Sequence, residues 1–116
     1  MTEDDVRAAW IASRAAACEA AEAEKQSHLA VAMLFDMYQA LEPGERLVID
    51  RLLADDLSSD SEPLRFLALA LLQEFGISSA LEDLRSLALK LETATGPGAP
   101  YEWAKVNRIV AQLSVR

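Results

Sequence analysis

The side chains best suited to nucleophilic or acid–base catalysis are few in this sequence. It contains one histidine, His28, and one cysteine, Cys18. A serine or cysteine nucleophile needs a neighbouring base, and His28 would have to serve, yet no catalytic motif surrounds it. Cys18 lies among alanines, where we expect a buried and inert thiol. The sequence therefore predicts no catalytic residues and a protein that is not an enzyme.

Motifs that bind metals or phosphates are also lacking. Glu24 and His28 are four residues apart, which suits two ligands on one helix face, but no second pair completes a coordination shell. Adjacent carboxylates such as Asp4 and Asp5 point to different faces of a helix and cannot act together as general acid and base. The glycines at 96 and 98 follow no strand and indicate a turn. We expect neither a metal nor a cofactor.

The composition is that of a single ordered, acidic domain spanning residues 1–116. Hydrophobic residues make up 52% of the chain, and a domain of this length buries roughly two-thirds of its unfolded surface. The net charge is −8, with fourteen acids and five bases in residues 1–62 against five acids and six bases in residues 63–116. Such a field repels nucleic acid and anionic membranes and attracts a basic protein surface. The acids can equally serve only to keep the chain in solution.

No segment indicates export or membrane insertion. The longest strictly apolar runs, of which Phe66–Leu72 is one, are far shorter than the ~20 residues that a spanning helix needs. Residues 1–5 are acidic where a secretory signal would be basic. We therefore expect a cytoplasmic protein that does not contact a membrane.

Apolar spacing and helix-end signals predict six helices and no strands. Thr2 suits a helix start, Gly76 suits a C-terminal cap, and Ser79 with Glu82 has the spacing of a capping box. The fold class is therefore all-α, and the polar gap between the first two helices leaves open whether they are continuous. The predicted helices span 3–24, 27–41, 43–57, 63–76, 79–92 and 100–113.

Two helices carry specific predictions about their buried faces. In the first, alanines dominate and leave Val6, Trp10 and Ile11 as the main apolar anchors. In the last, burial of Trp103 is expected, because a stripe at spacings of three and four runs from it through Val106, Val110 and Leu113.

The predicted helices also repeat. Starts at 27, 63 and 100 are 36 and 37 residues apart, and those at 43 and 79 are 36 apart. This period suggests hairpins at 3–41, 43–76 and 79–113, each covering the apolar face of the next. A plain bundle of similar-length helices would give comparable spacing, so both arrangements remain open.

One stretch carries a family resemblance. The segment "SDSEPLRFLALALLQEFG" resembles a HEAT repeat through Asp60, Leu64, Arg65, Ala68, Leu72 and Gly76. The next unit, 79–113, fits with an enlarged turn, and Lys105 or Arg108 supplies its basic character. The leading hairpin, 3–41, matches only in length.

The resemblance implies a right-handed α–α superhelix of stacked antiparallel hairpins that binds proteins and has no catalytic residues. Small bacterial HEAT-like proteins include immunity proteins that neutralise a toxin. In units of this kind the acid of the turn pairs with the basic residue that opens the second helix. The resemblance therefore implies an ion pair between Asp60 and Arg65 that ties the turn together.

Two surfaces are candidates for a partner. Acids at Asp36, Glu45, Asp55 and Asp56 suit a basic target. On the last helix Tyr101, Lys105 and Arg108 recur at four and three residues, placing an aromatic ring beside cations as in interface hot spots. Arg65 is a further, minor candidate for partner contact. Each set can also be an ordinary solvated helix face.

These features predict a non-catalytic protein-binding module. Its acidic N-terminal half would cover a basic surface of a protein partner, for example a toxin for which this chain is the immunity protein or inhibitor. The alternative is a structural module that forms a homodimer through its alanine-rich first helix.

Overall fold

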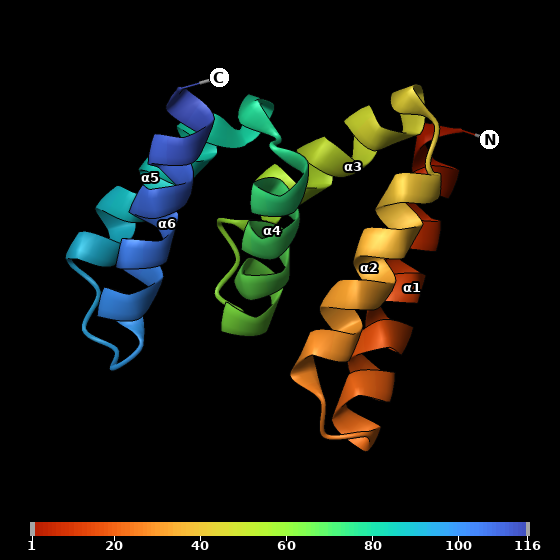
Figure 1. Ribbon diagram of the computed structural model, residues 1–116, viewed down its shortest axis with the longest axis horizontal. Helices are drawn as coiled ribbons and strands as arrows, with labels where there is room; N and C mark the ends of the chain where they lie inside the picture. The colour runs from red at the N-terminus through yellow and green to blue at the C-terminus, as the bar shows by residue number, and fades with distance from the viewer. Residues whose placement is uncertain (1, 116) are drawn as a thin grey trace. The chain divides into compact units, whose positions relative to one another are not determined.

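The computed structural model describes residues 2–115, except the side chain of Ser27. These residues form six α-helices, one 3-10 turn and no strand, which confirms the all-α prediction (Figure 1). None of the helices is both long and apolar enough to cross a membrane. The elements are α1 (Glu3–Ala23), α2 (Ser27–Ala40), α3 (Pro43–Asp56), α4 (Glu62–Phe75), η1 (Ser78–Ala80), α5 (Leu81–Glu92) and α6 (Ala99–Ser114).

The helices belong to two compact units, Met1–Leu52 and Leu53–Arg116, and the boundary falls within α3. In the first unit α1 packs against α2 as an antiparallel hairpin (Figure 1). In the second unit α5 packs against α6, and α4 also contacts α6. The single-domain organisation and its division into three hairpins remain predictions.

Helix α1 begins as the sequence predicts, with Thr2 at its N-terminal cap. The Thr2 hydroxyl accepts a hydrogen bond from the Asp5 amide at 3.2 Å, and the Asp5 carboxylate accepts one from the Thr2 amide at 3.1 Å. This reciprocal pair is a capping box, which satisfies two amides that lack partners within the helix.

A left-handed residue separates α1 from α2. Lys25 has φ 55°, and it is the only non-glycine residue with positive φ among the described residues. The Gln26 amide donates to the Ala21 carbonyl at 2.9 Å, and the Lys25 amide donates to the Glu22 carbonyl at 3.1 Å. These two bonds form a Schellman motif, which ends the helix and reverses the chain. The first two helices are therefore distinct.

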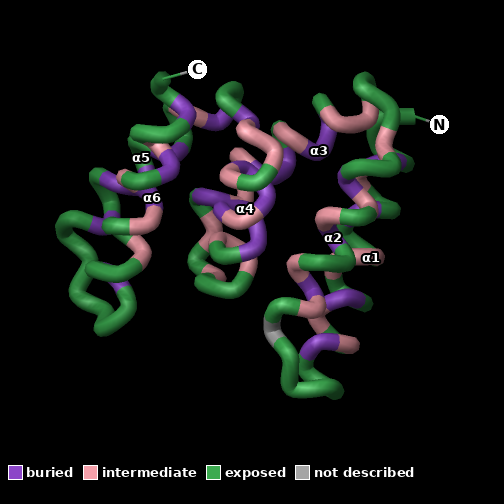
Figure 2. The backbone as a smooth tube through the Cα atoms, in the orientation of Figure 1, coloured by how far each residue is buried: buried purple, intermediate pink, exposed green. Residues whose placement is uncertain are grey.

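The core of the first unit confirms Val6 and Trp10 but not Ile11. Val6 and Trp10 are buried together with Ala17 and Ala21 of α1, and Leu34 of α2 is fully covered. Buried and exposed stretches alternate along both helices (Figure 2). Ile11 is 42% exposed. It follows Trp10 directly, so it lies about 100° further around the helix, away from the buried stripe.

The core of the second unit shows a different rotation of α6 from the predicted one. Val106, Ile109 and Leu113 are buried, whereas Trp103 is 39% exposed and Val110 is half-buried. The expected burial of Trp103 is therefore wrong. The helix carries two apolar stripes with similar spacing, and the one that includes Ile109 faces the core.

The predicted capping box at the start of α5 is also wrong. Residue Ala80 precedes α5 and makes no side-chain cap, and the chain enters the helix through the 3-10 turn η1 instead. Glu82 accepts a hydrogen bond from Arg85 at 2.9 Å rather than bonding back to the chain. At the other end of this connection Gly76 does cap α4, with φ 61°.

The rotation of α6 predicts how strongly substitutions at Ile109 and Trp103 change the stability of the protein. Ile109→Ala should lower the free energy of unfolding by about 2–5 kcal/mol, because it opens a cavity in the core. Trp103→Ala removes a larger side chain but should cost less than Ile109→Ala, since much of Trp103 is already exposed. Urea unfolding of both variants measures the difference, and a larger loss for Trp103→Ala would contradict the observed rotation.

Candidate functional site

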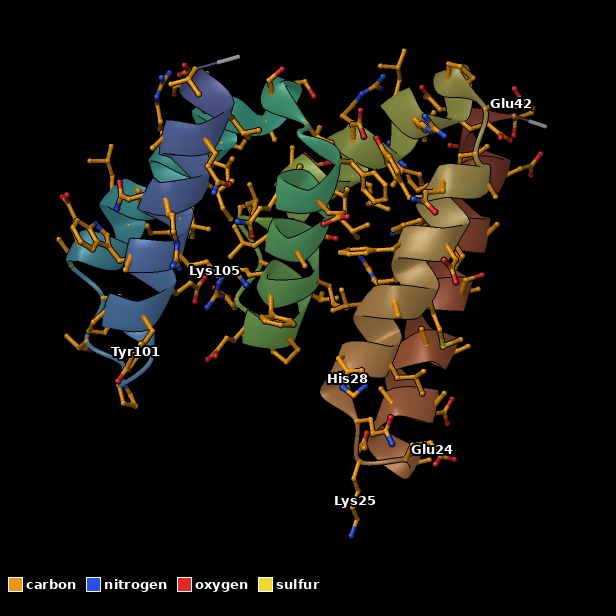
Figure 3. All side chains as sticks on the ribbon, viewed as in Figure 1. Glu24, Lys25, His28, Glu42, Tyr101 and Lys105 are labelled. Atoms are coloured by element: carbon orange, nitrogen blue, oxygen red, sulfur yellow. The ribbon has the colours of Figure 1, made fainter. Side chains whose placement is uncertain are left out.

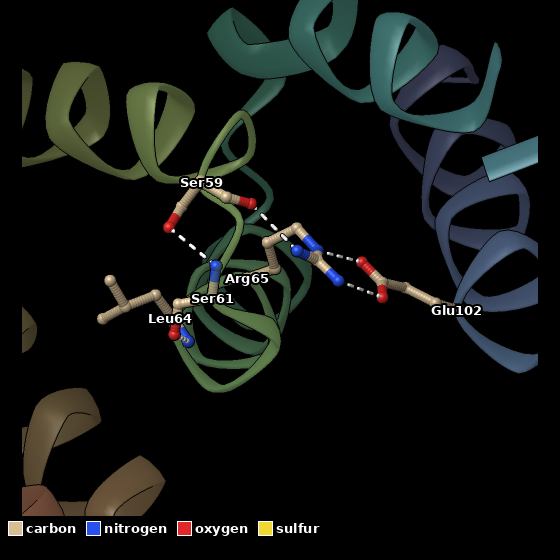
Figure 4. A network of polar contacts seen from close by, with 5 residues as sticks. All are labelled: Ser59, Ser61, Leu64, Arg65 and Glu102. Atoms are coloured by element: carbon tan, nitrogen blue, oxygen red, sulfur yellow. Dashed lines mark hydrogen bonds and ion pairs between the residues drawn. The ribbon is translucent and has the colours of Figure 1, made fainter. Parts of the chain in front are cut away.

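Arg65 holds together three segments of the second unit. Its Nε and Nη2 donate to the Glu102 carboxylate at 2.6 and 3.0 Å, and its Nη1 donates to the Ser59 carbonyl at 2.8 Å (Figure 4). The guanidinium thus connects the turn before α4, α4 itself and the first turn of α6. The planar fork of arginine matches both oxygens of a carboxylate, which makes this type of pair strong and directional.

The surroundings of Arg65 keep it charged and fixed. The Arg65 and Glu102 side chains are only 15% and 12% exposed. Hydrogen bonding to Glu102 raises the pKa of Arg65, although burial acts in the opposite direction. The Ser61 hydroxyl accepts from the Leu64 amide at 3.4 Å and caps α4, so the helix that carries Arg65 has a defined start.

The ion pair implied by the HEAT resemblance, Asp60 with Arg65, is not the one that forms. Asp60 is exposed and acts on Arg65 only through longer-range attraction, while Glu102 binds the guanidinium directly. Arg65 and Glu102 are 37 residues apart, the same spacing as that between Pro63 and Pro100. This shared spacing is the signal in the sequence that relates Glu102 to Arg65.

A shallow groove of about 200 Å³ lies beside Arg65. Three leucines contribute apolar surface, and Asp60 and Lys90 add opposite charges without forming an ion pair with each other. Binding pockets for drug-sized molecules are typically about 300–1000 Å³, so this groove suits a single side chain rather than a large cofactor. Its lining residues are Leu57, Ser59, Asp60, Arg65, Leu87, Lys90, Leu91 and Ala94.

Along the contact between α4 and α6 lies a surface of mixed aromatic and basic character. We call Phe66, Tyr101, Lys105 and Arg108 the cation–aromatic face. The Lys105 ammonium lies 4.3 Å from the centroid of the Phe66 ring, an attractive cation–π contact. Burial, followed by repulsion from Arg108, lowers the pKa of Lys105. Phe66 is 45% exposed and Tyr101 is 83% exposed, so both rings are accessible.

Polar contacts in the first unit connect the C-terminal end of α2 to α3. The Tyr38 hydroxyl donates to Asp50 at 2.6 Å, and burial raises the pKa of both groups. Arg46 donates to the carbonyls of Tyr38 and Gln39 at 3.3 and 2.8 Å. Arg46 therefore satisfies carbonyls at the negative end of α2, where a cation is favourable.

The predicted acidic site residues divide between the two units. Asp36 is exposed on α2, and Glu45 is half-buried and accepts a hydrogen bond from the Glu42 amide at 2.9 Å. Glu45 therefore has a structural role at the start of α3. Asp55 is exposed and Asp56 is half-buried, and both lie in the part of α3 that belongs to the second unit.

Three exposed acids were not among the predicted site residues. Glu19 and Glu22 lie near the C-terminal end of α1, which has no basic residue in its last turn. Glu24 is the C-cap residue of the same helix (Figure 3). Negative charge is unfavourable there because the helix dipole is also negative at that end. The close spacing of these acids before the Lys25 turn is a signal visible in the sequence.

The residues first considered for chemistry are not assembled into a site. His28 is exposed, and Cys18 is half-buried rather than buried. Within the described part of the chain, no group of three or more His, Cys, Asp or Glu side chains could hold a metal ion. Comparison of the chain with protein-family models, curated proteins and solved structures found no match. Its functional interpretation therefore depends on its own surfaces.

The Arg65–Glu102 pair should contribute measurably to stability. Arg65→Ala or Glu102→Ala should each cost about 2–4 kcal/mol, since the remaining charge loses its partner in a largely buried position. The double variant should cost less than the sum of the two. The matched control is Arg85→Ala, which removes a pair with side chains 50% and 87% exposed and should cost only about 0–1 kcal/mol. Strictly additive losses in urea unfolding would show that the pair is not coupled.

The burial of Asp50 should make stability depend on pH. Because burial raises the pKa of Asp50 in the folded state, the folded protein takes up this proton first as the pH falls from about 7 to about 4. Asp50 therefore contributes more stability at the lower pH. Asp50→Asn should remove this contribution, and urea unfolding across the range would detect it. An unchanged pH profile would contradict the raised pKa of Asp50.

Proposed function

We propose that this chain is a non-catalytic protein-binding module built from HEAT-like stacked helical hairpins, and that its acidic N-terminal half covers a basic surface of a partner protein. The sequence separation of the residues that join α4 to α6 supports the hairpin arrangement. The exposed carboxylates of the first unit support the basic partner.

The helix contacts have the spacing expected of stacked hairpins. In a solenoid each repeat contacts its neighbour, so residues about one period apart lie together. The contacts of α4 with α6 join Arg65 to Glu102, Phe66 to Lys105 and Gln73 to Gln112. Their separations are 37, 39 and 39 residues, close to the 36 and 37 residues between helix starts.

The carboxylates of the first unit carry the functional proposal. Residues 1–52 contain ten acids and five bases. Of those bases, Arg46 is bound to carbonyls of α2, and Arg51 pairs with Glu3 at 3.5 Å. Several exposed acids have no ion-pair or hydrogen-bond partner within residues 2–115, namely Glu19, Glu22, Glu24 and Asp36.

This charge distribution favours a basic partner. A cationic surface would compensate the acids at the C-terminal end of α1 and the negative end of the helix dipole together. Proteins that bind nucleic acids present such surfaces. A toxin that acts on nucleic acid is therefore one partner of the required chemistry, and an immunity protein would inhibit it by covering that surface.

The proposal predicts rapid, salt-sensitive association. The test measures binding kinetics with a basic protein that co-purifies with this chain or is encoded beside it. Electrostatic steering raises association rates by about 10–1000-fold at low salt, so combining Glu19→Gln, Glu22→Gln and Glu24→Gln should slow association about ten-fold. Dissociation should change less.

The matched control removes the same charge from the second unit. Glu74→Gln, Glu82→Gln and Glu92→Gln replace three exposed acids that lie outside the proposed surface. This variant should associate almost as fast as the original chain. An equal effect of the two triple variants, or binding that does not depend on salt, would refute the role of the N-terminal acids.

A further inference from the structure

The cation–aromatic face has an excess of positive charge in an otherwise acidic protein. Lys105 has the Phe66 ring as its close partner, and neither Lys105 nor Arg108 forms an ion pair with another residue in 2–115. Tyr101 projects from the start of the same helix (Figure 3). Exposed rings beside unpaired cations are typical of residues that become covered in a complex. The occupant should carry negative charge and leave room for a ring.

The outward side of α1, opposite its buried residues, carries negative charge and leaves room for a ring. Ala8, Ile11 and Ala15 are exposed along this side, because spacings of three and four place them on one face of the helix. Glu19 and Glu22 continue this side toward the C-terminal end of the helix. The face therefore changes from small and apolar residues to acidic ones along a single direction.

The two helix faces match in spacing as well as in charge. Tyr101, Lys105 and Arg108 are separated by four and three residues, and so are Ala15, Glu19 and Glu22. We propose that the cation–aromatic face of one copy binds the outward side of α1 in a second copy, with the two helices parallel.

In this arrangement each side chain has a complementary partner. The Tyr101 ring packs over Ala15, whose small side chain allows close approach. Lys105 meets Glu19, and Arg108 meets Glu22. The contact does not depend on the proposed basic partner, because both faces belong to this chain. It would nevertheless compete with that partner, since it covers the same acids.

The test is a charge exchange followed by sedimentation over a range of concentrations at low and high salt. The original chain should self-associate at low salt and dissociate at high salt. A variant with Lys105→Glu and Arg108→Glu should remain monomeric because two acidic faces repel, and one with Glu19→Lys and Glu22→Lys should remain monomeric because two basic faces repel. Mixing the two variants should restore association, because each then supplies the charge that the other lacks.

Two controls separate this contact from general effects of charge or folding. Arg85→Glu with Lys90→Glu makes the same charge change on α5 and should leave self-association intact. Arg108→Glu alone changes an exposed residue and should weaken association with the helical circular dichroism unchanged. A single monomer mass at every concentration at low salt would overturn the proposal. So would failure of the mixed variants to associate, or self-association that none of these substitutions alters.

Discussion

The bidentate pair between Arg65 and Glu102 is the constraint on which the second unit depends. It connects α4 to the first turn of α6 in a largely buried position, so it fixes how α6 is rotated. With Glu102 directed toward Arg65, Ile109 turns into the core and Trp103 turns partly outward. The same rotation places Lys105 over the Phe66 ring. One ion pair thus links the packing of α6 to the surface that it presents.

The negative charge on the surface of the first unit is not neutralised by Arg46 or Arg51. Arg46 binds the carbonyls at the end of α2, and Arg51 pairs with Glu3, so neither is free to neutralise the other acids. Asp50 is partly buried against Tyr38, whereas Asp36 remains at the surface. The acidic character of this unit is consequently concentrated on exposed side chains. Glu45 differs from these acids, because it accepts a hydrogen bond from the Glu42 amide at the start of α3.

Local signals explain which parts of the structure could be predicted from the sequence. Helix ends depend on residues such as Thr2 and Gly76, whose preferences act over a few positions, and the six helices were therefore predictable. The rotation of α6 was not, because two apolar stripes overlap and the choice depends on Glu102, 37 residues from its partner. The left-handed turn at Lys25 could not be predicted either, because lysine has no preference for a left-handed backbone. For the candidate site, the grouping of Tyr101 with Lys105 was predictable from helical spacing, but its contact with Phe66 was not.

The turn at Lys25 has an implication for local motion. A left-handed conformation costs a residue with a Cβ roughly 1–2 kcal/mol, and residues 22–26 are all exposed, so burial adds little to hold this tip together. The repulsion among neighbouring glutamates acts at the same end of α1. The hairpin tip should therefore open more often than the body of the helices and exchange its amide hydrogens sooner. Contact with a positively charged surface would reduce this local opening. The tip would then become ordered when a complex forms.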